Sequence, residues 1–402
     1  MTVRQLPVER RTVLRCCLCD RPAGGAGGAA ACDCEPAPNR RAVTEPPPTA
    51  REFLDSLAGR DLWRYQALLP ARREHGSGLQ VGGTPLLDLG TALDGVRLRA
   101  KDETRNPSGS LKDRATEVAL AVARAHGHHE VVAASTGNAG ASMACIAAAQ
   151  GLRATVFVPA AAPPAKLTQI RAYGAELRTV DGSYDEAFDR AVAHAREHGL
   201  YCRNTGVNPY TREGKKTCAL EIAEALGWDV PDWVVVPCGD GNILSGIGAG
   251  FAELADLGLL PGVPRLIAAQ AASSDSIRRS WAAALARGGR VDREPVPVTP
   301  ATAADSIAVS RPRDHLAAVR ALLRSDGLAA AVAEEEIRWA AGELARRFGL
   351  WVEPSTAAGY AALARLRREG TVREGDSAVL LLTGTGLKDP DPWPAAPPEA
   401  QR

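Results

Sequence analysis

The chain has 402 residues, 45% of them hydrophobic, and a formal net charge of +1. This length and composition suit a globular protein with a large core and more than one structural unit. The sequence has no long basic run with interleaved aromatics and no apolar stretch near the ~20 residues that span a bilayer, so nucleic acid and membrane are poor candidates as partners. Because no apolar signal segment follows residues 1–9, we expect a cytoplasmic protein that acts on a small molecule.

The first 34 residues contain five of the nine cysteines. An odd total in a chain without an export signal argues against a disulfide framework and favours reduced thiols. Cys16, Cys19, Cys32 and Cys34 form C-x2-C and C-x-C pairs that could supply four thiolates to a structural zinc ion. The alternative is a ribbon without metal, because a glycine-rich link separates the pairs and the second pair is tighter than usual for a zinc knuckle.

A proline-rich polar stretch at 38–50 predicts a linker, so residues 1–50 are expected to form a separate extension. Beyond it, short β-branched runs alternate with alanine-rich helical stretches. The strand and helix pairs are expected at 96–102 and 111–127, 131–136 and 140–151, 154–160 and 164–174, 233–239 and 243–258, and 265–271 and 276–288, with a last strand at 378–384. This alternation predicts an α/β protein with open parallel sheets and helices on both faces.

Five loops that mix glycine with hydroxyl or amide residues stand out between these elements. Most of them follow predicted strands, which is where ligands bind in open parallel sheets. The five are residues 106–113, 134–140, 204–217, 236–246 and 382–389. We therefore expect them to carry the chemistry.

Two of these loops have the character of anion sites. In the loop after strand 233–239, Gly239 and Gly241 leave backbone amides bare at a helix start, although neither a Walker A motif nor a dinucleotide fingerprint is present. A tight strand-to-helix crossing is the alternative explanation. In the loop after strand 131–136, Ser135, Thr136 and Asn138 could hold a carboxylate at a helix start, or Ser and Thr could simply cap the helix.

Lys112 follows two small turn residues, Ser108 and Gly109, and opens a helical stretch. With its ordinary pKa of about 10.4 a lysine is a poor nucleophile at neutral pH, but burial lowers this value and lets the amine form a Schiff base. A lysine that only extends from the helix start into water is the weaker alternative, because the helix dipole disfavours a cation there. Together with a phosphate cradle and a carboxylate site, Lys112 suggests bound pyridoxal phosphate.

Eight motifs occur in order between about residues 60 and 390, namely DLWRYQALLP, GGTPLLDL, KDETRNPSGSLKDRAT, ASTGNAG, NPYTREGKKT, PDWVVVPCGDGN, ADSIAV and LLTGTGLKDP. Together they resemble the fold-type II pyridoxal-phosphate enzymes and, within them, the threonine synthase family. The resemblance implies a two-domain fold of the tryptophan synthase β type, in a homodimer. The large cofactor-binding domain would comprise residues 51–110 and 210–390, the small domain residues 111–209, and a disordered tail residues 391–402. The N-terminal cysteine pairs resemble that family's ribbon.

The resemblance also implies roles for individual residues. Lys112 would bind the cofactor covalently and move protons between substrate carbons, Asn138 would contact the phenolic oxygen, and Thr383 would face the pyridine nitrogen. The cofactor phosphate would be held by the loop after strand 233–239, at Gly239, Asp240, Gly241, Asn242 and Ile243. The substrate would be bound by Ser135, Thr136, Asn204, Asn208 and Arg212.

One departure from the family pattern concerns the substrate. Where the family motif reads N-P-Y-R, with an arginine that helps to hold the phosphate of O-phosphohomoserine, this chain has Thr211 and places Arg212 one residue later. If Arg212 turns into the site, helped by Lys215 or Lys216, it could take over this contact. If it points to solvent, the site lacks this contact with the substrate phosphate and a shorter substrate becomes the better fit.

Three functions are therefore considered. The one we predict is a threonine synthase, which converts O-phosphohomoserine to threonine and phosphate by γ-elimination and β-addition of water. The alternative is β-replacement or β-elimination on serine, O-phosphoserine or threonine, as in cysteate-synthase-like or dehydratase-like enzymes. A catalytically silent binding protein is disfavoured by the intact Lys112 and phosphate loop.

Overall fold

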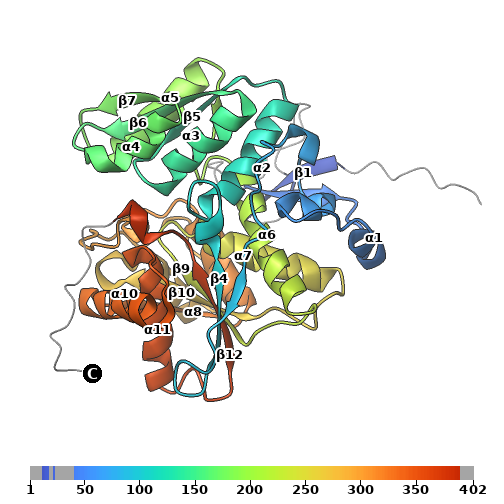
Figure 1. Cartoon of the computed structure of the whole chain (residues 1–402), viewed down its shortest axis with the longest axis vertical. Helices are drawn as coiled ribbons and strands as arrows, with labels where there is room; N and C mark the ends of the chain where they lie inside the picture. Colours follow the sequence, from blue (N-terminus) through green and yellow to red (C-terminus); the bar gives the residue numbers. More distant parts are fainter. Residues whose placement is uncertain (1–10, 18–20, 23–39, 390–402) are drawn as a thin grey trace, which may run out of the picture.

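The computed structural model describes residues 11–17, 21–22 and 40–389 (Figure 1). Their strands form two open sheets with helices on both faces, so the predicted α/β fold is confirmed. The predicted domain boundaries remain a prediction, and the predicted tail at 391–402 lies outside the described residues.

The larger sheet has the strand order β11 (Leu328–Val332), β10 (Arg265–Ala271), β9 (Trp233–Pro237), β12 (Ser377–Leu382), β4 (Arg97–Asp102) and β3 (Leu86–Asp88). Neighbouring strands are parallel except for the short edge strand β3, which pairs antiparallel with β4. One face packs on α10 (Glu334–Phe348) and α11 (Pro354–Arg368), and the other on α6 (Tyr210–Ala225), α7 (Asn242–Asp256), α8 (Ser276–Ala286) and α9 (His315–Arg324). Because both faces are buried, the central strands are continuous apolar runs.

The smaller sheet has the order β7 (Glu176–Val180), β6 (Arg153–Pro159), β5 (Glu130–Ala134) and β8 (Tyr201–Cys202), with all strands parallel. One face packs on α5 (Tyr184–Glu197), and the other on α2 (Lys112–Ala125), α3 (Asn138–Gln150) and α4 (Pro164–Ala172). In Figure 1 this sheet lies above the larger one, and α2 and α6 run beside both. The predicted helices at 111–127, 140–151, 164–174, 243–258 and 276–288 correspond to α2, α3, α4, α7 and α8.

The expectation of a single loop at 204–217 is wrong from Tyr210 onward, because α6 begins there. The Tyr210 amide donates to Asn208 Oδ1 at 3.0 Å, and most of the helix is buried against α7 and α2. Gly214 permits the close crossing with α2, since a Cβ at this position would lie 1.9 Å from the Arg114 carbonyl oxygen. Burial against α7 and α2 thus stabilises α6, although the polar residues and glycine of its first turns are typical of a loop.

Strands β1 (Arg11–Cys16) and β2 (Arg40–Glu45) pair antiparallel near the N-terminus, and the short helix α1 (Ala50–Asp55) follows them. Of the four proposed zinc ligands, Cys16 is described and buried, whereas Cys19, Cys32 and Cys34 lie outside the described residues. Within residues 11–17, 21–22 and 40–389 no group of three or more His, Cys, Asp or Glu is placed to hold a metal ion. The zinc hypothesis therefore stays a prediction. Over the same residues, no helix is long and apolar enough to cross a membrane.

A buried ion cluster joins α2 to α6 and to the end of β4. Arg114 is fully buried, and its guanidinium donates to both oxygens of Glu103 at 2.6 and 2.8 Å and to both oxygens of Glu221 at 2.7 and 2.6 Å. Lys101 also donates to Glu221 at 2.6 Å. Burial disfavours the charge on Glu221, but Arg114 and Lys101 outweigh it and lower the pKa of this carboxyl to about 2. Removing one member would leave the others charged in the interior.

We predict that Arg114→Met lowers the free energy of unfolding at pH 7 by about 3–5 kcal/mol, because it leaves the Glu103 carboxylate without its cation. Urea titration followed by circular dichroism measures the change. Arg64→Met is the matched control. Its ion pair with Glu224, also on α6, is at 2.6 Å but partly exposed, so its loss should cost no more than about 1 kcal/mol. Equal losses of unfolding free energy in the two variants would contradict the conclusion that the buried cluster stabilises the fold more than the partly exposed pair does.

The same cluster predicts a pH dependence. The pKa of Glu221 is depressed in the folded state, so its contribution is complete above the ordinary value of 4.5 and is lost as the pH falls toward about 2. The stability difference between the wild type and Glu221→Gln should therefore shrink across this acid range and stay constant from pH 5 to 8. A difference that grows on acidification would show that the carboxylate is not stabilised as described.

Candidate active site

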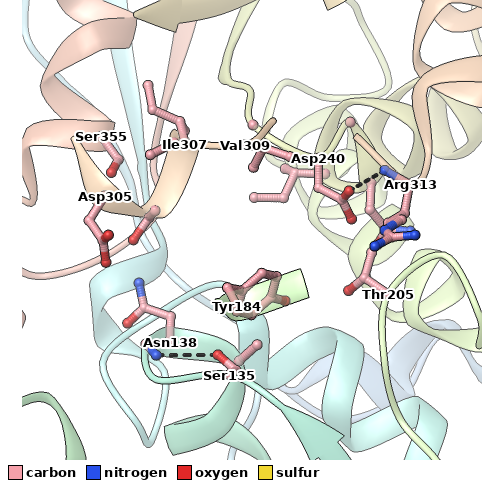
Figure 2. A pocket seen from close by; sticks show the side chains of 18 of the residues that line it. Ser135, Asn138, Tyr184, Thr205, Asp240, Asp305, Ile307, Val309, Arg313 and Ser355 are labelled. Carbon is pink, nitrogen blue, oxygen red and sulfur yellow. Dashed lines mark hydrogen bonds between the residues drawn. The ribbon is translucent and has the colours of Figure 1, made fainter. Parts of the chain in front are cut away.

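A cavity of about 480 Å³ lies where the carboxyl ends of β5, β8, β9 and β12 converge, and most of the sequence-predicted site residues line it. Side chains from the smaller sheet and its helices lie on one side, and side chains from the loops of the larger sheet face them across the cavity (Figure 2). The first group includes Ser135, Asn138, Tyr184 and Thr205, and the second includes Asp240, Asp305, Ile307, Val309 and Arg313. This is the place where open parallel sheets bind ligands.

Lys112 is the first residue of α2 and reaches the cavity from the turn before it. That turn is held in place by Asp113, whose carboxylate accepts the Ser108 amide at 2.6 Å and the Ser108 hydroxyl at 2.5 Å. The Leu111 amide donates to the Thr383 carbonyl at 3.0 Å, which ties the turn to the end of β12. Among the described residues the Lys112 amine has no hydrogen bond or ion pair, and burial lowers its pKa. The amine is thus positioned and partly desolvated, as nucleophilic catalysis requires.

The loop from Gly239 to Asn242 forms an anion cradle at the start of α7. Gly241 has φ +88° and precedes the helix, and no side chain caps the amides of its first turn. A Cβ at Gly241 would lie 2.7 Å from Ala318 Cβ, and one at Gly239 would lie 2.8 Å from Ile307 Cα, so only glycine fits. Bare amides at the positive end of a helix dipole can bind an anion, so the loop has the geometry of the predicted cradle, while the two close contacts also fit the packing explanation.

Lys215, which the sequence interpretation did not assign to the cofactor, also lines this part of the cavity. It is buried on α6 and donates to Asn242 Oδ1. Burial lowers its pKa far below the ordinary value, and the nearby charges of Lys112 and Arg203 add to the effect. Opposite it, the Asp240 carboxylate accepts the Arg313 amide, and burial raises its pKa to about 6. An anion bound here would relieve the repulsion among the cations.

The second anion site lies at the start of α3. Ser135 Oγ accepts the Gly137 amide at 3.2 Å, and the cap residue of the helix is Gly137, without any side-chain cap. The alternative that Ser135 and Thr136 cap the helix is therefore wrong. The Asn138 amide donates to Glu353, while its buried oxygen has no partner among the described residues. This helix start thus keeps its polar groups available to a ligand.

Glu353 is a site residue that the sequence interpretation missed. It is buried, accepts from Asn138 of α3 on one oxygen and from Ser306 Oγ at 2.7 Å on the other, and so connects the two sides of the cavity. A Cβ at Gly384 would lie 1.7 Å from Glu353 Oε1, so glycine is needed beside it. Thr383 lines the cavity and shares a hydrogen bond of 2.9 Å with Thr356. In the sequence, Glu353 stands out in one respect: its carboxylate comes directly before Pro354, the first residue of α11.

The residues predicted from the sequence divide into two groups. The cavity is lined by all the proposed cofactor residues and by three of the proposed substrate residues, namely Ser135, Thr136 and Asn204. Asn208 instead donates to the Cys202 carbonyl at 2.9 Å and accepts the Tyr210 amide at 3.0 Å, just before α6. Arg212 is not brought to this cavity. It is buried in an ion pair with Asp314, donates to Ser245 Oγ at 3.1 Å, and lies on the side of α6 that faces β2.

The periodicity of α6 explains where Arg212 lies. Residues four apart lie within about 40° of each other around a helix, whereas neighbouring residues are turned by about 100°. Lys215 lines the active-site cavity, while Arg212 and Lys216, four residues apart, line a second cavity beneath the β1–β2 pair. The shift of the arginine by one residue therefore turns its side chain by about 100° from the direction of Thr211, to Asp314 and the second cavity.

Comparison with known proteins agrees with this geometry. A family model described as pyridoxal-phosphate dependent enzyme matches residues 78–384. The threonine synthase of Methanocaldococcus jannaschii is 37% identical over 335 residues, covering 82% of this chain and 81% of that protein. The threonine synthase of Mycobacterium tuberculosis strain H37Rv is 37% identical over 314 residues, covering 77% and 83%.

Solved structures show the same fold. The processed form of threonine deaminase isoform 2 from Solanum lycopersicum superposes with a TM-score of 0.63 and 22% identity, covering 75% of this chain and 83% of that one. Maize serine racemase gives a TM-score of 0.63 at 24% identity, covering 75% and 88%.

We predict that Gly241→Ala weakens the binding of pyridoxal phosphate about tenfold or more. The new Cβ meets Ala318 and strains a backbone with φ +88°, which distorts the cradle by a cost of about 1–3 kcal/mol. Titration of the cofactor-free protein, followed by absorbance, measures the dissociation constant. Gly258→Ala is the control, because this glycine has φ +75° at the other end of α7 with open space around its Cβ. A similar loss of affinity in both variants would point to general destabilisation instead.

Proposed function

The chain belongs to the pyridoxal-phosphate-dependent enzyme family and, within it, to the threonine synthases, and on this premise we propose that it converts O-phosphohomoserine to threonine and inorganic phosphate. The observation that carries the proposal is the meeting in one cavity of Lys112, a phosphate-sized cradle and a second anion site at the start of α3. A cofactor phosphate and a substrate carboxylate would occupy the two anion sites.

The residues of the cavity fit pyridoxal phosphate. Lys112 would hold it covalently, and the amides of Gly239 to Asn242 would take its phosphate, with Ile243 beside them and Lys215 as the nearest counter-charge. Two features support this fit, namely the backbone amides at the start of α7 that no side chain caps and the buried Asn138 Oδ1 that has no hydrogen-bond partner among the described residues. When bound, the cofactor supplies an electron sink that allows protons to leave the substrate carbons. Thr383 would face its ring nitrogen with a hydroxyl, which cannot keep that nitrogen protonated as a carboxylate would.

Lys112 would transfer protons to and from the carbon atoms of the substrate. Burial lowers its pKa and so favours the neutral amine, which can accept the proton from the α-carbon and return a proton later in the reaction. Ser135 and Thr136, with the amides at the start of α3, would fix the substrate carboxylate and so orient the bond to the α-hydrogen. The Asn204 side chain would hold this loop in place, since its oxygen accepts the Ala134 amide at 2.8 Å.

The proposed reaction balances without any further reactant than water. The bond between the γ-carbon and the phosphate oxygen breaks, and the phosphate leaves with the electron pair. Water then supplies the hydroxyl group on the β-carbon, and the γ-carbon ends as a methyl group. O-phosphohomoserine and water thus become threonine and phosphate.

We expect the purified protein to be yellow and borohydride to fix the cofactor irreversibly on Lys112. Peptide mass spectrometry after reduction identifies the modified lysine. Lys112→Ala should lower turnover by several orders of magnitude, because it removes both the covalent anchor and the proton carrier. Lys215→Gln is the control: it should still be labelled at Lys112 but bind the cofactor more weakly. Labelling of Lys215 in the wild type would show that the two lysines have been assigned the wrong roles.

A substrate panel separates the proposed function from its alternative, β-replacement or β-elimination on serine, O-phosphoserine or threonine. We predict equimolar phosphate and threonine from O-phosphohomoserine, measured by phosphate release and amino-acid chromatography. Serine and threonine should give little 2-oxo acid. Turnover of three-carbon substrates without any threonine from O-phosphohomoserine would instead assign the enzyme to the alternative.

A further inference from the structure

We propose that Arg203, together with Asn204 and Thr205, forms a site that binds a second negative group of the substrate, beyond its α-carboxylate. The proposal rests on the proposed function and assigns to these residues the contact with the phosphate end of its substrate. These three residues follow β8 directly and line the active-site cavity. Figure 2 shows Thr205 beside the cavity, next to Arg313.

Arg203 is a buried cation without a counter-ion in the part of the chain that the structure describes. Its side chain is 1% exposed, and there its guanidinium donates only to the hydroxyl of Thr116, at 3.2 and 3.0 Å. Two other deeply buried arginines, Arg114 and Arg212, both pair with carboxylates. Burial lowers the pKa of Arg203 to about 10, which measures how poorly its charge is compensated. An unpaired buried charge is costly, and a bound anion would remove most of that cost.

The two following residues add donors beside Arg203. Asn204 Oδ1 accepts the Ala134 amide at 2.8 Å, which fixes the orientation of the side chain. Its buried amide nitrogen then has no acceptor among the described residues. Thr205 contributes a hydroxyl to the same wall of the cavity. Three consecutive residues thus supply a guanidinium, an amide and a hydroxyl, which can donate hydrogen bonds to the several oxygens of a phosphate.

A count of cavity charges within residues 40–389 indicates that this site serves the substrate and not the cofactor. Five cationic residues line the cavity there, and two of them are paired, Arg313 with Asp185 at 2.9 Å and Arg311 with Glu294 at 3.3 Å. Of the remaining three, Lys112 would be joined to the cofactor and Lys215 lies at the phosphate cradle. The start of α3 would take the α-carboxylate. Of the three acidic residues that line the cavity there, Asp185 pairs with Arg313, Asp305 pairs with Lys166, and Asp240 accepts the Arg313 amide without an ion pair to Arg203. Of the five cations Arg203 alone remains without an assigned anion, so we expect the substrate to bring one.

The location also accounts for the charge that Thr211 does not supply. Arg212 is held by Asp314 and does not line the active-site cavity, while Thr211 donates its hydroxyl to the Asn208 carbonyl at 2.9 Å. Neither residue offers a cation to the cavity. Arg203 places one there from the neighbouring strand end.

The test measures ligand binding to the holoenzyme from the change in cofactor absorbance. Arg203→Gln should raise the dissociation constant of O-phosphohomoserine by about 30-fold or more, while that of homoserine, which lacks the phosphate, changes less than about twofold. Arg203→Lys should recover part of the loss. Arg311→Gln is the matched control, because it removes a paired and exposed arginine from the cavity rim and should change neither constant.

Inorganic phosphate provides a second readout that does not depend on turnover. It should compete with O-phosphohomoserine in the wild type but not in Arg203→Gln. Equal weakening of homoserine and O-phosphohomoserine in Arg203→Gln, or phosphate competition that survives the change, would overturn the proposal. If the substrate panel yields no threonine while phosphate still binds through Arg203, the proposed function fails and the anion site stands.

Discussion

The ion cluster of Arg114 with Glu103 and Glu221 is the constraint on which the active-site geometry depends. Arg114 lies two residues after Lys112 on α2, and Glu221 lies on α6, the helix that carries Lys215. Because the forked guanidinium bonds both carboxylates with two hydrogen bonds each, the two helices have one favourable relative position. Gly214 strengthens this constraint, since any larger residue would push α6 away from the Arg114 backbone. The way α2 and α6 cross therefore sets the distance between Lys112 and Lys215 in the cavity.

The cavity combines buried positive charge with few negative groups. Lys112, Lys215 and Arg203 have no carboxylate partners among the described residues, and desolvation lowers the pKa of each. In a site shielded from water such charges act over longer distances than on the surface. The burial that makes these cations attract an anionic ligand also lowers the pKa of the Lys112 amine and so favours its neutral, basic form. Ligand selection and proton transfer therefore have one electrostatic origin.

The two sides of the cavity are connected through a few polar contacts. Glu353 accepts from Asn138 on α3 and from Ser306 in the facing loop, and Arg313 in that loop pairs with Asp185 on α5. Lys166 on α4 pairs with Asp305 at 2.8 Å in the same manner. Contacts of this kind fix how closely the smaller sheet approaches the larger one, and so the width of the space between the Ser135 loop and the phosphate cradle.

What the sequence determined by itself was local. Lys112, the Gly239–Asn242 cradle and the Ser135–Asn138 helix start could be predicted because each depends on a short run of residues in which glycine, a turn or a helix start has direct chemical meaning. The alternation of strands and helices likewise predicted the parallel sheets. Glu353 and Arg203 could not be found in this way, since their importance lies in partners 215 residues away or in the lack of any carboxylate partner within the described part of the chain.

Only the tertiary structure decided the position of Arg212. Its neighbours in sequence point to the substrate, but burial of α6 between α2 and α7 continues the helix through this segment and sets its rotation. On a helix, neighbouring side chains are turned by about 100°, so Lys215 lines the active-site cavity while Lys216 lies with Arg212, which pairs with Asp314, at the second cavity. A sequence specifies which charges a chain has, whereas the packing of its helices decides which cavity receives them.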